Sequence, residues 1–182
     1  MQLETSRLRL IELDKEVLRD IHELHSNPKV DEFNTLGIPE NIFTTERLMN
    51  EWLEQSVAMP RISYVFQIRL ADSDKFVGLI ALNLGKPGFK SAEIWYKTLP
   101  NFWGKGYSTE RVEAILNFGF RNLNLHRIEA GCAVDNIASV KVLQKTGFSK
   151  EGKKRRNLPI RGEWVDNYFF AILETDRKKG GS

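Results

Sequence analysis

The chain has 182 residues, of which 41% are hydrophobic and 28% are charged, a composition that suits one soluble globular domain with its own core. A net charge of +3 is too small to indicate a nucleic-acid-binding protein, and a single cysteine excludes an internal disulfide and a cysteine-based metal site. No apolar run approaches the roughly 18 residues that cross a bilayer, and no basic-then-apolar leader opens the chain, so we expect a cytoplasmic protein without a membrane partner.

The first half of the chain mixes the two kinds of hydrophobic spacing. Alternating apolar residues predict strands, and apolar residues three or four apart predict helices. In chain order we expect a strand at 7–10, a helix at 13–24, a helix entered at Thr44, and strands at 64–68, 76–84 and 91–99.

The second half alternates strands and helices more regularly. We expect a helix at 112–120, a strand at 127–134, a helix at 136–145, and strands near 148–151 and 164–173. Gly147 should end the second of these helices in the left-handed conformation. The pattern predicts an α/β (α+β) fold with a mixed sheet, organised as one domain over 1–176 and a flexible tail over 177–182.

A glycine-rich turn, LPNFWGKGYSTER at 99–111, joins a predicted strand to a predicted helix. Glycines support neither element, so the backbone there needs a positive φ or the close approach of another group. The first N–H groups of a helix have no partners within the helix, and they attract anions. If Ser108 caps this helix, a capping box would place Glu or Gln three residues later, where the chain has Arg111. A phosphate site and a tight turn without a ligand both remain consistent with this loop.

Two nucleotide-binding motifs do not fit the same loop. A Walker loop requires Gly-x-x-x-x-Gly-Lys-Ser/Thr, which is absent. A dinucleotide-binding fingerprint requires a third glycine three residues after Gly106, where the chain has Thr109.

Two separated motifs, AEIWYKTLPNFWGKGYSTE and RIEAGCAVDNIASVKVLQKTGF, resemble the GNAT superfamily of acetyl-CoA-dependent N-acetyltransferases. The branch they are most similar to contains the RimJ/RimL-like ribosomal-protein acetyltransferases. The resemblance runs from the opening ETSRLRL to the final strand. It implies a mixed, mostly antiparallel central sheet flanked by helices, acetyl-CoA as cofactor, and homodimerisation as a feature common in the family.

The family's Gln/Arg-x-x-Gly-x-Gly/Ala motif corresponds to Trp103–Ser108, with Gly106 as its central glycine. Trp103 and Ser108 depart from the pattern, which matters little for a loop that works through backbone amides. The resemblance implies that this loop binds the pyrophosphate of coenzyme A and that the preceding strand pairs with the pantetheine arm. The cofactor-binding residues implied are Tyr96, Lys97, Thr98, Trp103, Gly104, Lys105, Gly106, Tyr107, Ser108, Thr109 and Asn136.

The second motif begins with Asn136-Ile137-Ala138-Ser139. A structural interpretation is that Asn136 caps a helix whose first turn contains Ser139. The resemblance implies instead that Asn136 binds the cofactor arm and that Ser139 protonates the departing thiolate. Many relatives use a tyrosine one turn later, but that position is Leu143 here.

In the implied reaction an amine attacks the thioester directly, through a tetrahedral intermediate. Cys132 would be the obvious nucleophile if a covalent intermediate formed, but it alternates with apolar residues and should pack in the core. A general base should accept the amine proton. Relatives that place a Glu on the preceding strand would have it at Gly131, so we expect Glu93 to be the base, with Glu129 as the alternative; each could also be a solvated strand residue.

Several other polar and aromatic groups can be interpreted either as structural or as functional. The three histidines are too scattered for a metal site, so we expect no metal. Lys153–Arg156 reads as a solvated hairpin end or as a contact for an acidic partner. Residues that could shape the acceptor pocket, or simply pack, are Phe33, Trp95, Trp164, Asp166 and Tyr168.

The sequence therefore predicts transfer of an acetyl group from acetyl-CoA to a primary amine, either a protein N-terminal amine, as in ribosomal proteins, or a small-molecule amine. Two alternatives remain: a ribosome- or RNA-associated binding module without catalysis, and a transferase that uses another acyl-CoA.

Overall fold

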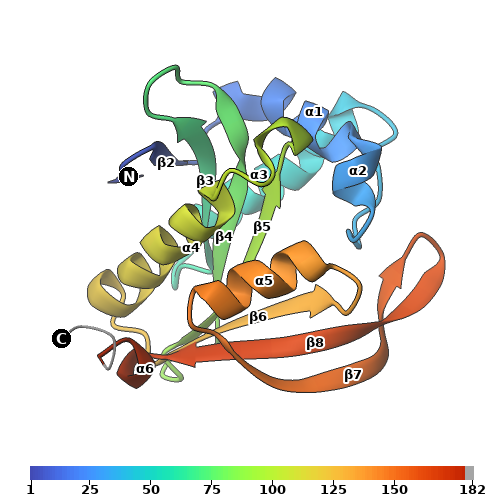
Figure 1. Cartoon of the computed structure of the whole chain (residues 1–182). Coiled ribbons are helices and arrows are strands. Elements are labelled where there is room, and N and C mark those ends of the chain that lie inside the picture. Colours follow the sequence, from blue (N-terminus) through green and yellow to red (C-terminus); the bar gives the residue numbers. More distant parts are fainter. Residues whose placement is uncertain (179–182) are drawn as a thin grey trace.

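The computed structural model describes residues 1–178, whose strands form one eight-stranded sheet in the order β1-β2-β3-β4-β5-β6-β8-β7 (Figure 1). The strands are β1 (Gln2–Glu4), β2 (Leu8–Glu12), β3 (Ser63–Leu70), β4 (Phe76–Leu84), β5 (Ser91–Thr98), β6 (Arg127–Ala133), β7 (Ser149–Ile160) and β8 (Glu163–Leu173). All neighbours are antiparallel except β5 and β6. The mixed, mostly antiparallel sheet predicted from the sequence is therefore confirmed.

Helices cover both faces of this sheet (Figure 1). They are α1 (Leu18–Ser26), α2 (Pro28–Asp31), α3 (Ile42–Val57), α4 (Tyr107–Asn117), α5 (Ile137–Lys145) and α6 (Glu174–Lys178). Short turns of other helical types are η1 (Lys15–Val17), η2 (Pro100–Phe102) and η3 (Phe118–Asn122). No helix among residues 1–178 is long and apolar enough to cross a membrane.

Two hydrophobic cores result from the strict alternation of side chains along the strands. The larger core joins one face of the sheet to α4 and α5, with Ile94, Val112 and Leu143 among its members. The smaller core joins the other face to α1 and α3, through residues such as Ile21 and Trp52. β5 is central, so its side chains reach both cores.

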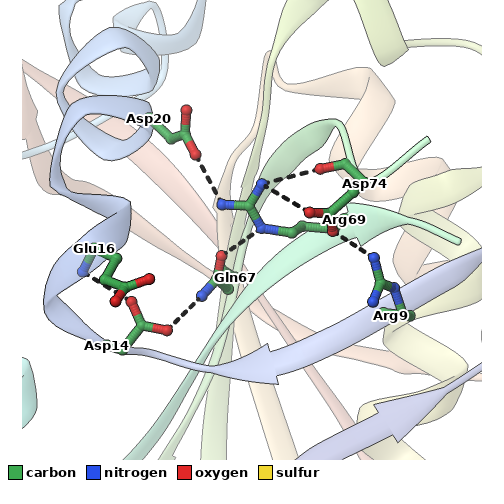
Figure 2. A network of polar contacts seen from close by, with 7 residues as sticks. All are labelled: Arg9, Asp14, Glu16, Asp20, Gln67, Arg69 and Asp74. Carbon is green, nitrogen blue, oxygen red and sulfur yellow. Dashed lines mark hydrogen bonds and ion pairs between the residues drawn. The ribbon is translucent and has the colours of Figure 1, made fainter.

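Polar side chains join α1 to β3 of the sheet (Figure 2). Arg69 of β3 donates to Gln67 at 2.7 Å and to Asp20 of α1 at 3.0 Å. Gln67 donates in turn to Asp14, which caps η1 through the backbone N–H of Glu16. This network fixes the position of the helical layer that covers the second face of β5.

The last two strands form a long hairpin that the sequence prediction shortened. β7 extends to Ile160, with register shifts after Lys150 and after Lys154. Asp166 of β8 accepts from Lys153 Nζ and from the backbone N–H of Arg156, both at 2.9 Å, and so holds the second irregularity. Residues 177 and 178 of the expected tail lie in α6, and 179–182 lie outside the described residues.

Candidate active site

The strands β5 and β6 pair for only part of their length. Their parallel register runs from Ser91↔Arg127 to Ile94↔Ala130, yet β5 continues to Thr98 and β6 to Ala133. Residues 95–98 of β5 pair with β4 alone. The side of β5 that β6 leaves is therefore open to another extended, hydrogen-bonding chain.

The glycine loop follows β5 directly and leads into α4. Gly104 and Gly106 have φ values of +73° and +82°, which side-chain-bearing residues rarely adopt. Gly106 occupies the N-cap position without any side-chain cap, so the first N–H groups of α4 remain available. A Cβ atom at Gly104 would meet nothing within 4 Å. Free N–H groups beside open space suit a diphosphate.

Trp103 and Arg7 hold this loop in place. The Trp103 indole donates to the Thr98 carbonyl at 2.8 Å, which ties the loop to the end of β5. Arg7 donates to the Lys105 carbonyl at 3.0 Å, and its guanidinium lies 4.7 Å from the centre of the Tyr107 ring. Sequence reasoning missed Arg7, because nothing in its own segment indicates that β2 begins beside the loop.

Glu110 in the first turn of α4 binds the segment that precedes β2. Its carboxylate accepts from Thr5 at 2.6 Å, from the Arg7 backbone at 2.9 Å and from Arg7 Nε at 2.7 Å. Burial acts to raise the pKa of Glu110, but these hydrogen bonds and the Arg7 charge outweigh it and lower the pKa. Glu110 is thus the anchor through which Arg7 reaches the loop.

Ser139 lies in the first turn of α5, beside β5. The Asn136 side chain caps α5 by accepting from the Ser139 backbone N–H at 3.1 Å. The Ser139 hydroxyl lies 2.8 Å from the Tyr96 hydroxyl. Burial raises the pKa of Tyr96 to about 12, although the Ser139 hydrogen bond and the Arg111 charge oppose it. Two hydroxyl groups therefore meet where β5 and β6 separate.

Cys132 lies in the larger hydrophobic core, between the sheet and helices α4 and α5, where it is buried. Burial raises the pKa of its thiol to about 11, although a hydrogen bond from Ser139 opposes the shift. Such a thiol is protonated at neutral pH and a poor nucleophile. The expectation that Cys132 packs in the core is confirmed.

The opposite face of β5 carries Glu93, Trp95 and Lys97, of which Trp95 contacts Trp52 of α3 and Lys97 contacts His25 of α1. Glu93 is in register with Glu129 of β6, one residue before the parallel pairing ends. The surrounding protein and the Glu129 charge raise the pKa of Glu93, and Lys154 opposes them. Glu129 accepts from Arg127 Nε at 2.7 Å, whereas Glu93 has no hydrogen bond or ion pair with any other described side chain.

Lys97 ends this row of side chains and meets the helical layer. Its ammonium lies 3.4 Å from the His25 ring of α1. Burial lowers the pKa of Lys97 to about 8, opposed by Asp31, and burial with two neighbouring charges lowers the pKa of His25 to about 3. Asp31 accepts from Arg161 at 3.3 Å, which joins α2 to the tip of the β7–β8 hairpin. Sequence reasoning did not single out His25, Asp31 or Arg161 as neighbours of the site.

The residues expected to form the acceptor pocket do not gather in one place. Trp95 packs against Trp52 of α3 at 5.3 Å between ring centres, on one face of the sheet. Tyr168 packs against Phe170 on the other face. Trp164 is 62% exposed near the hairpin tip, Asp166 is engaged by the hairpin, and Phe33 lies just after α2.

A separate cavity of about 190 Å³ lies between the end of α1, the loop before α3 and α3 itself. His25, whose ring lies beside the Lys97 ammonium, is one of its lining residues. None of its lining residues comes from β5, β6 or α5, so this cavity is separate from the place where Ser139 meets Tyr96. No group of three or more His, Cys, Asp or Glu residues within 1–178 could hold a metal ion.

Residues 7–149 match the acetyltransferase (GNAT) domain family. An uncharacterised N-acetyltransferase of Bacillus subtilis, YnaD, is 33% identical over 179 residues, which is 97% of this chain and 99% of the relative. The [ribosomal protein uS5]-alanine N-acetyltransferase of Escherichia coli is 27% identical over 73% of this chain and 66% of the relative. The structure of Vibrio cholerae spermidine N-acetyltransferase in complex with CoA and spermine superposes with a TM-score of 0.83, at 27% identity over 94% of this chain and 98% of the other. The chain therefore belongs to the GNAT acetyltransferase family and is an acetyl-CoA-dependent N-acetyltransferase.

Proposed function

We propose that this enzyme acetylates the α-amine of a protein N-terminus by direct attack on the thioester, with Ser139 and Glu93 as its two proton-transfer groups. The observation that carries the proposal is their placement on opposite sides of one strand. Ser139 meets Tyr96 on one face of β5, and Glu93 lies on the other face, where the β5–β6 pairing ends. Glu93 can then accept a proton from the nucleophile on one side of the strand, while Ser139 donates a proton to the leaving group on the other.

The proposed chemistry needs one base and one acid. Acetyl-CoA, held by the glycine loop and the open side of β5, supplies the acetyl thioester. Glu93 accepts the proton of the incoming amine, as the N–C bond forms and the C–S bond breaks. Ser139 donates its proton to the sulfur and regains one through Tyr96 or solvent. Glu129 is the weaker candidate for the base, because Arg127 already neutralises it.

Charge on the Glu93 face supports an acceptor with one amine. Lys97 lies four residues after Glu93 on that face, and Lys154 is close enough to influence the pKa of Glu93. A polyamine would bring several positive charges beside these lysines, whereas a peptide brings one. Among the relatives, one acts on a ribosomal protein and one is named for spermidine; a small-molecule amine is therefore the second candidate.

A panel of acceptors tests the proposal. The purified chain is mixed with acetyl-CoA and, separately, with short lysine-free peptides, the same peptides with blocked N-termini, spermidine, spermine and free amino acids. Thiol release is followed with time, and products are identified by mass spectrometry. We expect turnover with the free peptides and none with the blocked ones. Turnover restricted to the polyamines would overturn the peptide assignment and establish the second candidate.

Two variants serve as controls for the chemistry. Ser139→Ala and Glu93→Gln should each retain the fold and lower turnover about 100-fold with every acceptor. Thiol release that is unaffected by both changes would refute the assigned roles. Absence of turnover with all acceptors, together with salt-sensitive RNA binding, would favour the non-catalytic binding module instead. We also propose a cytoplasmic location, which the single free thiol of Cys132 supports.

A further inference from the structure

Arg111 is a fully buried arginine beneath the glycine loop. It lies one helical turn into α4 and has 0% exposure, which makes it the largest fully buried side chain of the described residues. No ion pair found within residues 1–178 includes it. Burial lowers its pKa to about 10, opposed by Tyr96, so the guanidinium is still charged at neutral pH. A buried cation without a carboxylate partner is costly and calls for a physical reason.

The guanidinium joins three elements, β4, β5 and α4. One terminal nitrogen donates to the carbonyls of Lys97 at 2.9 Å and Leu79 at 3.3 Å, on β5 and β4. The other donates to the Thr98 hydroxyl and, at 3.1 Å, to the Ser108 hydroxyl in the first turn of α4. Its Nε has no partner. The Tyr96 ring, whose centre lies 5.0 Å from the guanidinium carbon, interacts with this charge, but all the hydrogen-bond acceptors are neutral and none carries a negative charge.

The direction of these hydrogen bonds fixes where a hydroxyl proton can go. A guanidinium only donates, so the Thr98 and Ser108 hydroxyls both accept from it. The two hydroxyl oxygens lie 3.3 Å apart, so one of them can donate to the other. Thr98 is only 8% exposed, whereas Ser108 is half-buried at the start of α4. The proton left without an internal acceptor therefore belongs to Ser108, on the side of the loop.

We propose that Arg111 is a positioning residue for the diphosphate of coenzyme A. It orients the Ser108 hydroxyl as a donor to the diphosphate, and the negative charge of the diphosphate offsets the positive charge of the buried guanidinium. The inference rests on the assignment of the glycine loop to the cofactor. It adds a side-chain donor and a fixed charge to a site otherwise made of backbone N–H groups. A charge-assisted network in a buried setting is stronger than the same bonds in water.

Binding measured without any acceptor tests this role, so the result does not depend on which amine is acetylated. Affinities for CoA and for pantetheine, which lacks the diphosphate, are compared by calorimetry for the wild type and three variants. Arg111→Met removes the charge at similar length, Arg111→Lys keeps the charge, and Ser108→Ala removes the donor. Melting without ligand and circular dichroism check that each variant is folded.

We expect Arg111→Met to weaken CoA binding about 10- to 100-fold, which corresponds to about 1.4 to 2.7 kcal/mol. Pantetheine binding should change less than about twofold on the same scale. Ser108→Ala should show the same ligand selectivity with a smaller loss, and Arg111→Lys should restore part of the affinity. If Arg111→Met does not fold, Ser108→Ala and Arg111→Lys decide the question by the same comparison.

Equal weakening of CoA and pantetheine would assign Arg111 a merely structural role, and unchanged CoA affinity would remove any role in binding. Either result overturns the inference. A wild-type enzyme that binds CoA normally but acetylates only small amines would refute the peptide acceptor and leave the role of Arg111 intact.

Discussion

The hydroxyl groups of Tyr96 and Ser139 lie 2.8 Å apart, although 43 residues separate them in the chain. The contact joins the strand that precedes the glycine loop to the first turn of α5. Because the pKa of Tyr96 is raised to about 12, the phenol keeps its proton and can donate to Ser139. The Ser139 proton is then free to point towards a leaving group.

This geometry predicts unequal effects of removing the two hydroxyls. Ser139→Ala should lower kcat about 100-fold, within the range expected for loss of a general acid, with little change in the KM for acetyl-CoA. Tyr96→Phe should lower kcat by only about tenfold, because Ser139 can also regain its proton from solvent. Steady-state thiol release measures both. A larger loss in Tyr96→Phe than in Ser139→Ala would make Tyr96 the direct donor.

The two loop glycines predict a change in cofactor binding that can be separated from a change in stability. Acetyl-CoA and CoA, but not ATP, should stabilise the wild type, by about 2.7 kcal/mol at 100 times the dissociation constant. Gly106→Trp should abolish this stabilisation by placing an indole over the N-terminus of α4. Thermal shifts with each ligand provide the measurement.

Gly104→Ala is the matched control, because its added Cβ would meet nothing within 4 Å although its φ is also positive. It should lower the melting temperature without ligand and keep most of the ligand-induced shift. Loss of the shift in Gly104→Ala but not in Gly106→Trp would place the ligand elsewhere in the loop.

Much of the fold could be predicted because its signals are local. Alternation predicted β4 and β5 closely, and Gly147 has the expected left-handed φ of +88°. Asn136 caps α5 as the structural interpretation required. The capping-box argument at Arg111 assumed that α4 begins at Ser108, and this was wrong: the N-cap is Gly106, which has no side chain with which to cap the helix.

The remainder depends on tertiary contacts that no local pattern reports. β7 is exposed over most of its length, so it lacks the alternation that would predict its extension to Ile160. Helical spacing places Arg111 near apolar residues but cannot predict that strand carbonyls would surround it. The separation of β5 from β6 is a property of pairing, and the sequence of either strand alone contains no sign of it.

The Glu93–Glu129 pair predicts the acid side of the pH profile. Glu93 must be ionised to accept a proton, and its pKa is raised by the surrounding protein and then by the Glu129 charge, although its side chain is exposed. The acidic limb of kcat/KM should therefore lie above the ordinary carboxylate range, and activity should increase as pH rises through it. Glu93→Gln should abolish this limb and lower kcat about 100-fold at neutral pH.

Two neighbours of Glu93 should move that limb in opposite directions. Glu129→Gln removes a like charge, so it should lower the pKa of Glu93 and shift the limb to lower pH. Lys154→Met removes a favourable charge and should shift the limb to higher pH. If the pH profile of kcat/KM does not move in either variant, its acidic limb belongs to a group other than Glu93.

Glu110 predicts a pH-dependent contribution to stability that is separate from catalysis. Its carboxylate is 14% exposed and accepts hydrogen bonds from Thr5 and Arg7, so Glu110→Gln should lower the free energy of unfolding by about 1.5–3 kcal/mol at pH 7. The pKa of Glu110 is lowered below 4.5 in the folded protein. Its contribution is therefore present above the unfolded-state pKa and is lost as pH falls through the lower, folded-state value.

Urea unfolding across this pH range provides the measurement. The difference in the free energy of unfolding between the wild type and Glu110→Gln should shrink as pH falls below about 4.5. Protonation of Glu110 in the wild type removes the carboxylate charge that the substitution also removes. Glu113→Gln, one turn later on α4, is the control: Glu113 is 40% exposed in its ion pair with Arg177, so the change should stay within about 0.5 kcal/mol at all pH values. If the difference in the free energy of unfolding caused by Glu110→Gln stayed constant with pH, packing of the Glu110 side chain, and not its charge, would hold Arg7 against the loop.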